Sequence, residues 1–217
     1  IAGYVALGIP MESLLIASTM VPVGSILLSK IVCPQTEEIQ ELGEVKMDRK
    51  GNNENVLDAL ASGALDGMNM AMAIGASLIA IISIVALING ILGIFNISLE
   101  TILSYVFAPM GYLMGLEGKE VFTAGELLGS KLILNEFVAF GKLGLMLATM
   151  SERTGLMLAV SLAGFANVSS IGICISGISV LCPEKRPVLA KLALRAMIAG
   201  FCVSVLSALI VGIWLLF

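Results

Sequence analysis

The chain alternates long apolar stretches with short polar ones. Residues 67–99, 154–183 and 196–217 contain no Asp, Glu, Lys or Arg. Each stretch is long enough to cross about 30 Å of hydrocarbon as a helix. A fourth uncharged window, residues 13–29, is at the lower length limit. The pattern predicts an all-α polytopic membrane protein.

The first half of the chain is expected to hold three helices and a loop. Residues 1–8 have the pattern of a helix end, and Pro10 favours the start of the next helix, which with its flanks fills residues 1–33. Residues 34–55 are polar and rich in Gly and Asn, which indicates a solvated loop. A long helix follows over residues 56–93, about 55 Å at 1.5 Å per residue, so it is tilted or begins in the membrane interface.

The small residues Ala59, Gly63 and Gly67 fall on one face of this long helix at four-residue spacing. Such a face permits close helix packing, although small residues are also tolerated without any packing role. Residues 94–118 are too interrupted to span the bilayer. Their aromatic residues predict an interfacial helix.

The stretch "LILNEFVAF" sets Glu136 within an apolar run. Residues 121–134 and 137–150 are two apolar arms, each about half a bilayer long, on either side of the polar tip Asn135-Glu136. They predict a re-entrant hairpin over residues 121–150. A carboxylate at the bilayer centre costs about 2.5 to 3.5 kcal/mol, so Glu136 needs a partner or a function.

The next apolar stretch, residues 152–183, has "GFANVSSIG" at its centre. Gly, Asn and Ser are weak helix formers, so a discontinuous helix is expected, broken around Asn167, Ser169 and Ser170. A last helix fills residues 187–217. The hairpin and this broken helix would bring two irregular polar segments to midplane depth, where they must line a cavity or be buried in protein.

Each polar group also has a purely structural interpretation. Glu136 could form an ion pair with Lys131 or Lys142, or lie at the interface. Asn167 and the two serines could make ordinary hydrogen bonds between helices. Glu126 and Lys131 are expected to form a solvated or interfacial pair rather than part of a site.

Composition agrees with the membrane class that the apolar pattern predicts. The chain is 58% hydrophobic and 13% charged, against about 25% charged in a typical soluble domain. Its net charge of -4 comes mostly from residues 37–66, and it lacks the Lys and Arg clusters of nucleic-acid-binding proteins. There is no histidine, no metal-ligand cluster is evident, and the four cysteines are expected to be small buried residues rather than disulfides.

The Lys and Arg distribution predicts orientation. Four basic residues in "PEKRPVLAKLALR" place residues 183–187 in the cytoplasm and the C-terminus outside. The loop at residues 34–55 is then also cytoplasmic. The chain opens without a methionine or a signal peptide and within a helix, which suggests a fragment of a longer protein.

Two motifs carry a resemblance to a known family. "GELLGSKLILNEFVAF" followed by "LAGFANVSSIGICISGI" resembles the C-terminal half of the concentrative nucleoside transporters, with weaker support from "ALINGILG", "VFAPMGYLMG" and "KRP". The resemblance implies a cation-coupled nucleoside symporter of the plasma membrane, built on inverted repeats. It also implies a homotrimer assembled through the helix at residues 56–93, and makes residues 119–217 half of the transport domain.

The resemblance also implies roles for single residues. Glu136, Asn167 and Ser170 would bind the ribose, Phe165 would line the pocket, and Asn135 and Ser169 would support them. An ionised Glu suits hydroxyl donors because it only accepts hydrogen bonds. Val168, where Phe or Leu is expected, is a mild departure. The nucleobase and Na+ sites would lie upstream of Ile1, so no metal site is expected here and the coupling ion, Na+ or H+, stays open.

A channel or a structural subunit of a membrane complex is the alternative function. A channel would place polar rings along a continuous pore rather than two local breaks. A membrane enzyme with Glu136 as acid or base is disfavoured, because neither paired carboxylates at one depth nor a histidine accompany it.

Overall fold

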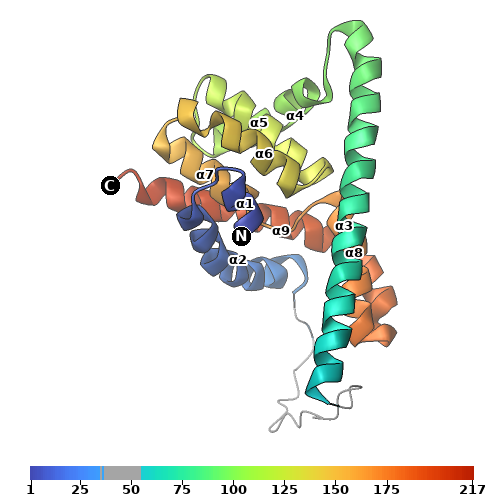
Figure 1. Ribbon diagram of the computed structural model, residues 1–217. Coiled ribbons are helices and arrows are strands. Elements are labelled where there is room, and N and C mark those ends of the chain that lie inside the picture. Colours follow the sequence, from blue (N-terminus) through green and yellow to red (C-terminus); the bar gives the residue numbers. More distant parts are fainter. Residues whose placement is uncertain (35, 37–54) are drawn as a thin grey trace. The chain divides into compact units, whose positions relative to one another are not determined.

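The computed structural model describes residues 1–34, 36 and 55–217, and within them every regular element is a helix (Figure 1). The elements are α1 Ala2–Ala6, α2 Met11–Val32, α3 Val56–Leu92, η1 Gly93–Phe95, α4 Leu99–Leu113, α5 Lys119–Ile133, α6 Glu136–Met146, η2 Leu147–Thr149, α7 Glu152–Leu162, α8 Val168–Leu181, η3 Pro183–Lys185 and α9 Arg186–Trp214. The predicted loop at residues 34–55 lies almost entirely outside the described residues.

The chain forms two compact units. One comprises Ile1–Pro34 with Ile97–Phe217, and the other is Gln35–Asn96. Among the described helices, Met11–Val32 and Pro183–Trp214 are long and apolar enough to cross a membrane. A third span exists if Ile82–Phe95 and Leu99–Leu113 count as one bent pair.

The core of the first unit lies where α9 packs against α2, α7 and α8, and where α5 packs against α4 and α6. Leu128, Phe140, Leu158 and Ala208 are fully buried in this core. In a bilayer such packing is held by van der Waals contact more than by expulsion of water. The packing fixes α5, α6, α7 and α8, the four helices that end or begin at the polar breaks (Figure 1).

The helix α4 crosses α5 at very short range because both carry glycine at the crossing. A Cβ at Gly111 would come 2.6 Å from the carbonyl oxygen of Val121, and a Cβ at Gly125 would overlap the backbone of α4 at Ser104. Leu103 is buried in this contact, whereas Tyr105 and Tyr112 are exposed on the outer side of α4. The glycines therefore allow α4 to support the first arm of the hairpin.

The second unit is dominated by α3, a helix of 37 residues. The side chain of Asn55 caps it, because its Oδ1 accepts a hydrogen bond of 2.9 Å from the backbone N–H of Asp58. Ala59, Gly63 and Gly67 are exposed, and among the described residues a Cβ at either glycine would meet nothing within 4 Å. No described residue of this unit therefore covers the small-residue face.

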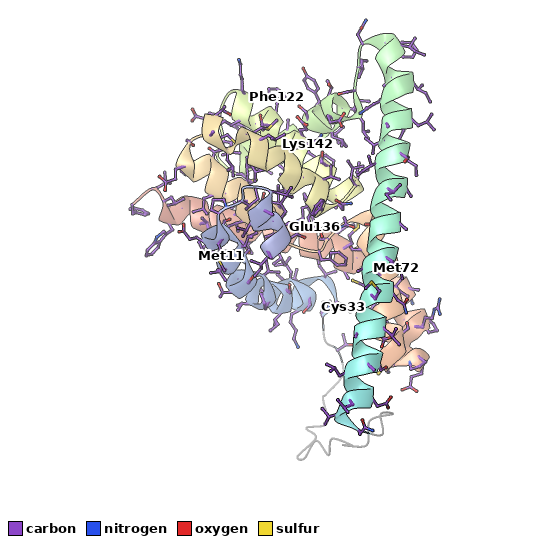
Figure 2. All side chains as sticks on the ribbon, viewed as in Figure 1. Met11, Cys33, Met72, Phe122, Glu136 and Lys142 are labelled. Carbon is purple, nitrogen blue, oxygen red and sulfur yellow. The ribbon has the colours of Figure 1, made fainter. Side chains whose placement is uncertain are left out.

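The expectation of buried cysteines is wrong. All four are free thiols; Cys33, Cys174 and Cys182 are exposed, and Cys202 is half-buried (Cys33 is labelled in Figure 2). An apolar run does not imply an interior position in a membrane protein, because lipid-facing surfaces are as apolar as the core.

Candidate functional site

The hairpin tip is a two-residue turn between α5 and α6. The helix α5 ends at Ile133, and α6 begins at Glu136 after the extended residue Asn135. The side chain of Asn135 caps α6, since its Oδ1 accepts a hydrogen bond of 2.9 Å from the N–H of Val138. Two short helices meeting at "NEF" confirm the predicted arms and tip, and Asn135 supports the tip as its N-cap.

The predicted break in the next segment spans Ala163 to Asn167, between α7 and α8. Ser169 and Ser170, expected within the break, instead form the first turn of α8. Asn167 and Ser170 make a reciprocal capping box: Asn167 Oδ1 accepts from the Ser170 N–H at 2.7 Å, and Ser170 Oγ accepts from the Asn167 N–H at 3.1 Å. Ser169 Oγ also donates to Asn167 Oδ1, at 2.6 Å.

The two breaks meet through Glu136 and Asn167. Asn167 Nδ2 donates a hydrogen bond of 2.6 Å to Glu136 Oε2. Asn167 is fully buried, and Glu136 is 9% exposed. Glu136 is the first residue of α6 and Asn167 the N-cap of α8, so the N-terminal ends of two helices converge on one carboxylate. Their positive dipole ends stabilise its negative charge.

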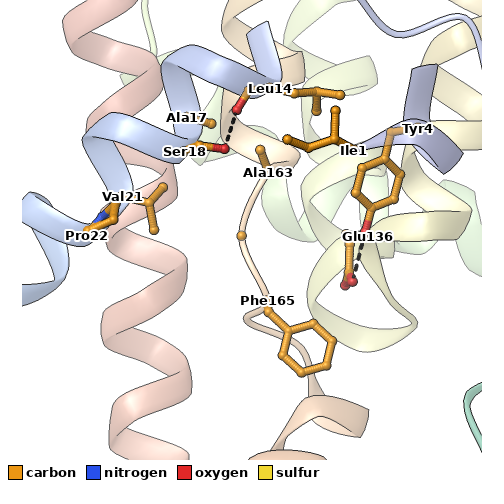
Figure 3. Close-up of a pocket in the computed structure, with 11 residues that line it drawn as sticks. Ile1, Tyr4, Leu14, Ala17, Ser18, Val21, Pro22, Glu136, Ala163 and Phe165 are labelled. Carbon is orange, nitrogen blue, oxygen red and sulfur yellow. Dashed lines mark hydrogen bonds between the residues drawn. The ribbon is translucent and has the colours of Figure 1, made fainter. Parts of the chain in front are cut away.

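Glu136 also faces a cavity of about 400 Å³ (Figure 3). Gly164 and Phe165 of the break line the same cavity, and the ring of Phe165 is 52% exposed. Tyr4 of α1 lines the cavity beside Glu136. The rest of the lining is mostly apolar; its residues are Ile1, Leu14, Ala17, Ser18, Val21, Pro22 and Ala163. A small, mostly apolar space with a single carboxylate has the character of a site for a compact ligand with hydroxyl groups.

The predicted site residues divide into two groups. Glu136 and Phe165 line the cavity, whereas Asn167 lies behind Glu136 with its amide engaged. Ser170 is almost fully buried and, with Phe165, lines a second cavity of about 330 Å³ bounded by α8 and α9. The structure therefore brings Glu136, Asn167 and Ser170 into one hydrogen-bond network, with Glu136 as its polar group on the wall of the first cavity.

Tyr4 is a site residue that the sequence pattern did not indicate. Its hydroxyl donates to Glu136 Oε1 at 3.3 Å (Figure 3), and its ring packs on Phe140 with the ring centroids 4.5 Å apart. A tyrosine in an otherwise apolar helix end was the available signal, because a buried phenol needs a polar partner. The partner lies 132 residues away in sequence and could not be named from the pattern.

Lys131 does not form the expected surface pair with Glu126. It is fully buried, and its Nζ donates a 2.7 Å hydrogen bond to the carbonyl oxygen of Ser161 in the last turn of α7. That carbonyl lacks a helical partner because the helix stops, and the amine supplies one. Nζ also lies 5.8 Å from the ring centroid of Phe201.

Lys142 rather than Lys131 pairs with Glu126, at 3.0 Å, and it also lies 3.3 Å from Glu100 of α4. Lys142 lies about two turns further along α6 than Glu136 (both are labelled in Figure 2). Neither lysine forms the proposed ion pair with Glu136, whose hydrogen-bond donors are the neutral groups of Tyr4 and Asn167. Within the described residues, no group of three His, Cys, Asp or Glu side chains could hold a metal ion.

Comparisons with known proteins agree with this architecture. The family described as "Na+ dependent nucleoside transporter C-terminus" matches residues 13–212. The chain is 39% identical to an uncharacterized transporter, YutK, of Bacillus subtilis, over 98% of the chain and 55% of that protein. It is 35% identical to the nucleoside permease NupC of Helicobacter pylori, over 99% of the chain and 54% of that protein.

The fold has a solved counterpart in the structure of CNTnw in an inward-facing, substrate-bound state. The TM-score is 0.90 and the identity 36%, over the whole chain and 54% of CNTnw. This match confirms the predicted class, an all-α membrane fold with a helical hairpin and a discontinuous helix. The chain spans about half the length of these relatives.

Proposed function

Because this chain belongs to the Na+-dependent nucleoside transporter family, a family of transporters and not of enzymes, we propose that it forms half of a secondary transporter that carries nucleosides into the cell. The observation that carries the proposal is Glu136, a carboxylate on a cavity wall held between two half-helix N-termini. A channel would place rings of polar groups along a continuous pore, whereas this carboxylate lies where two local helix breaks meet.

Ribose is the part of a nucleoside that fits Glu136. A carboxylate accepts hydrogen bonds and donates none, and ribose presents two adjacent hydroxyl donors. Hydrogen bonds to a charged group are shorter and stronger than neutral ones, so two such bonds from adjacent hydroxyls to Glu136 favour a sugar diol over other ligands. Phe165, half exposed beside Glu136, offers an apolar face to the bound ligand.

Asn167 and Ser170 complete the proposed ribose site. Their polar atoms form hydrogen bonds with each other and with Glu136. Ser170 Oγ has a lone pair and a proton that can turn to a new partner, since a hydroxyl both donates and accepts. We expect these groups to exchange some internal bonds for ribose hydroxyls, with Asn135 and Ser169 holding the two helix starts in place.

The coupling ion is proposed to be Na+, in line with the family's description. A carboxylate carried through the membrane costs energy that a bound cation offsets, and symport uses that cation's gradient to drive accumulation. The cation and nucleobase sites are proposed to lie outside residues 1–217. Within the described residues, Glu136 is the group that would bind the sugar. We therefore expect a nucleoside, such as uridine, as the substrate, and these residues favour no particular base.

Assembly and topology complete the proposal. The exposed face of α3 at Ala59, Gly63 and Gly67 would pack against its copies in a homotrimer, because small residues let backbones approach. We place residues 34–55 and 183–187 in the cytoplasm and the C-terminus outside the plasma membrane, following the basic residues near α9.

The test is Glu136→Gln in the protein expressed from its complete gene, in a host without its own nucleoside uptake. Glutamine keeps the size but removes the charge that would accept two hydroxyls. Charged hydrogen bonds contribute about 1.5 to 3 kcal/mol each, so uridine uptake driven by a Na+ gradient should fall at least tenfold. Membrane protein level should stay near wild type.

Glu117→Gln is the matched control, because Glu117 is an exposed carboxylate in the turn between α4 and α5. It should keep full uptake. Uptake above half of the wild-type rate in Glu136→Gln would contradict the proposal. Conductance in a planar bilayer without saturable uptake would favour a channel instead.

A further inference from the structure

Both oxygens of Glu136 accept hydrogen bonds from donors of the chain itself. Asn167 Nδ2 holds Oε2 at 2.6 Å, and the Tyr4 hydroxyl reaches Oε1 at 3.3 Å. The first distance is that of a short, charge-assisted hydrogen bond, whereas the second exceeds the usual O–H to O range. The two donors are therefore unequal, and the Tyr4 hydroxyl is the one that a ligand can displace.

The ring of Tyr4 is held beside the carboxylate by aromatic packing. It lies 4.5 Å from Phe140 and 6.3 Å from Phe137 between ring centroids, and both phenylalanines belong to α6. The hydroxyl thus sits on the wall of the first cavity, next to the oxygen that a sugar would use (Figure 3). Loss of the hydroxyl alone leaves this packing intact.

A nearly buried carboxylate oxygen without a donor is costly, and the Tyr4 hydroxyl supplies a donor to Glu136 Oε1 from within the chain. We propose that the Tyr4 hydroxyl is an internal substitute for one substrate hydroxyl. It gives up Glu136 Oε1 to the substrate hydroxyl when a nucleoside binds. The inference rests on the proposed nucleoside site and adds a residue that competes with the substrate.

A thermodynamic cycle between the protein hydroxyl and the substrate hydroxyls tests this competition. Tyr4→Phe should bind uridine about three to ten times more tightly, because the sugar no longer displaces an existing hydrogen bond. For the monodeoxyuridine that lacks the competing hydroxyl, the variant and the wild type should bind equally. Binding is measured by calorimetry on the purified full-length protein with uridine, 2'-deoxyuridine and 3'-deoxyuridine.

Tyr112→Phe is the control, because it removes the hydroxyl of an exposed tyrosine on α4. It should leave all three affinities unchanged. Weaker or unchanged uridine binding in Tyr4→Phe overturns the inference, and so does an equal shift for all three ligands, which a merely structural role would give. If the wild type does not bind uridine at all, the proposed function fails before Tyr4 is in question.

Discussion

Replacing Asn167 with aspartate would convert the shortest hydrogen bond of Glu136 into a contact between two carboxylates. In the structure Asn167 Nδ2 donates to Glu136 Oε2 at 2.6 Å, while Asn167 Oδ1 accepts from the Ser170 N–H. Aspartate retains the second interaction, so the cap of α8 survives. Only the donor is replaced, which makes Asn167→Asp a selective change at a fully buried position.

The expected cost has two parts. Loss of a hydrogen bond to a charged group removes about 1.5 to 3 kcal/mol. Two negative charges about 4 Å apart repel by about 4 kcal/mol at an effective dielectric constant near 20. The pair can relieve this repulsion by sharing one proton, so we expect a net loss of about 3 kcal/mol. For a chain of this size that lowers Tm by roughly 6 to 12 °C.

The assay is thermal unfolding of the detergent-purified protein, with the double variant Glu136→Gln/Asn167→Asp as the rescue. In the double variant the glutamine amide donates to the aspartate, so the hydrogen bond returns with its direction reversed and with one negative charge instead of two. Most of the lost Tm should return. Uridine uptake should remain at least tenfold below the wild-type rate, as in Glu136→Gln, because the negatively charged acceptor has moved behind the cavity wall.

The result that refutes this reasoning is a double variant no more stable than Asn167→Asp alone. It would mean that Glu136 and Asn167 do not interact in the folded protein. An Asn167→Asp variant as stable as the wild type would lead to the same conclusion.

Two further predictions concern the supports of the site. Lys131→Met keeps an unbranched apolar side chain but lacks the terminal amine, so the Ser161 carbonyl loses its donor. We expect a loss of about 1 to 3 kcal/mol and a several-fold rise in the KM for uridine. Wild-type values of both Tm and KM would contradict the role of Lys131. Gly144→Ala would drive a Cβ into the Leu7 carbonyl and push α1 off α6, at about 1 to 3 kcal/mol. Gly141→Ala, where a Cβ meets nothing within 4 Å, should leave Tm unchanged, and equal Tm values for the two glycine variants would refute the close contact.

The expectations that the structure overturns share a physical origin. A charged residue in an apolar run usually lies at the interface, and for that reason the pattern predicts a solvated pair for Lys131. Its actual partner is the carbonyl oxygen of Ser161, which is free only because α7 stops there. The pattern does not indicate a site role for Tyr4 because its partner, Glu136, is 132 residues away. In both cases the deciding contact joins segments whose proximity no local pattern encodes.

The positions of the two helix breaks follow from local sequence. The polar tip "NEF" and the weak helix formers in "GFANVSS" mark them, because Asn caps a helix through its own neighbouring backbone and needs no distant partner. Local sequence does not set the boundaries to the residue, since Ser169 and Ser170 belong to the first turn of α8. Which groups meet at the breaks depends on tertiary packing. Glu136 accepts hydrogen bonds from Asn167 and Tyr4 and from neither lysine. The packing of α1, α6 and α8 brings these donors within hydrogen-bonding distance of the carboxylate. A hydrogen bond depends on that distance and not on residue type alone.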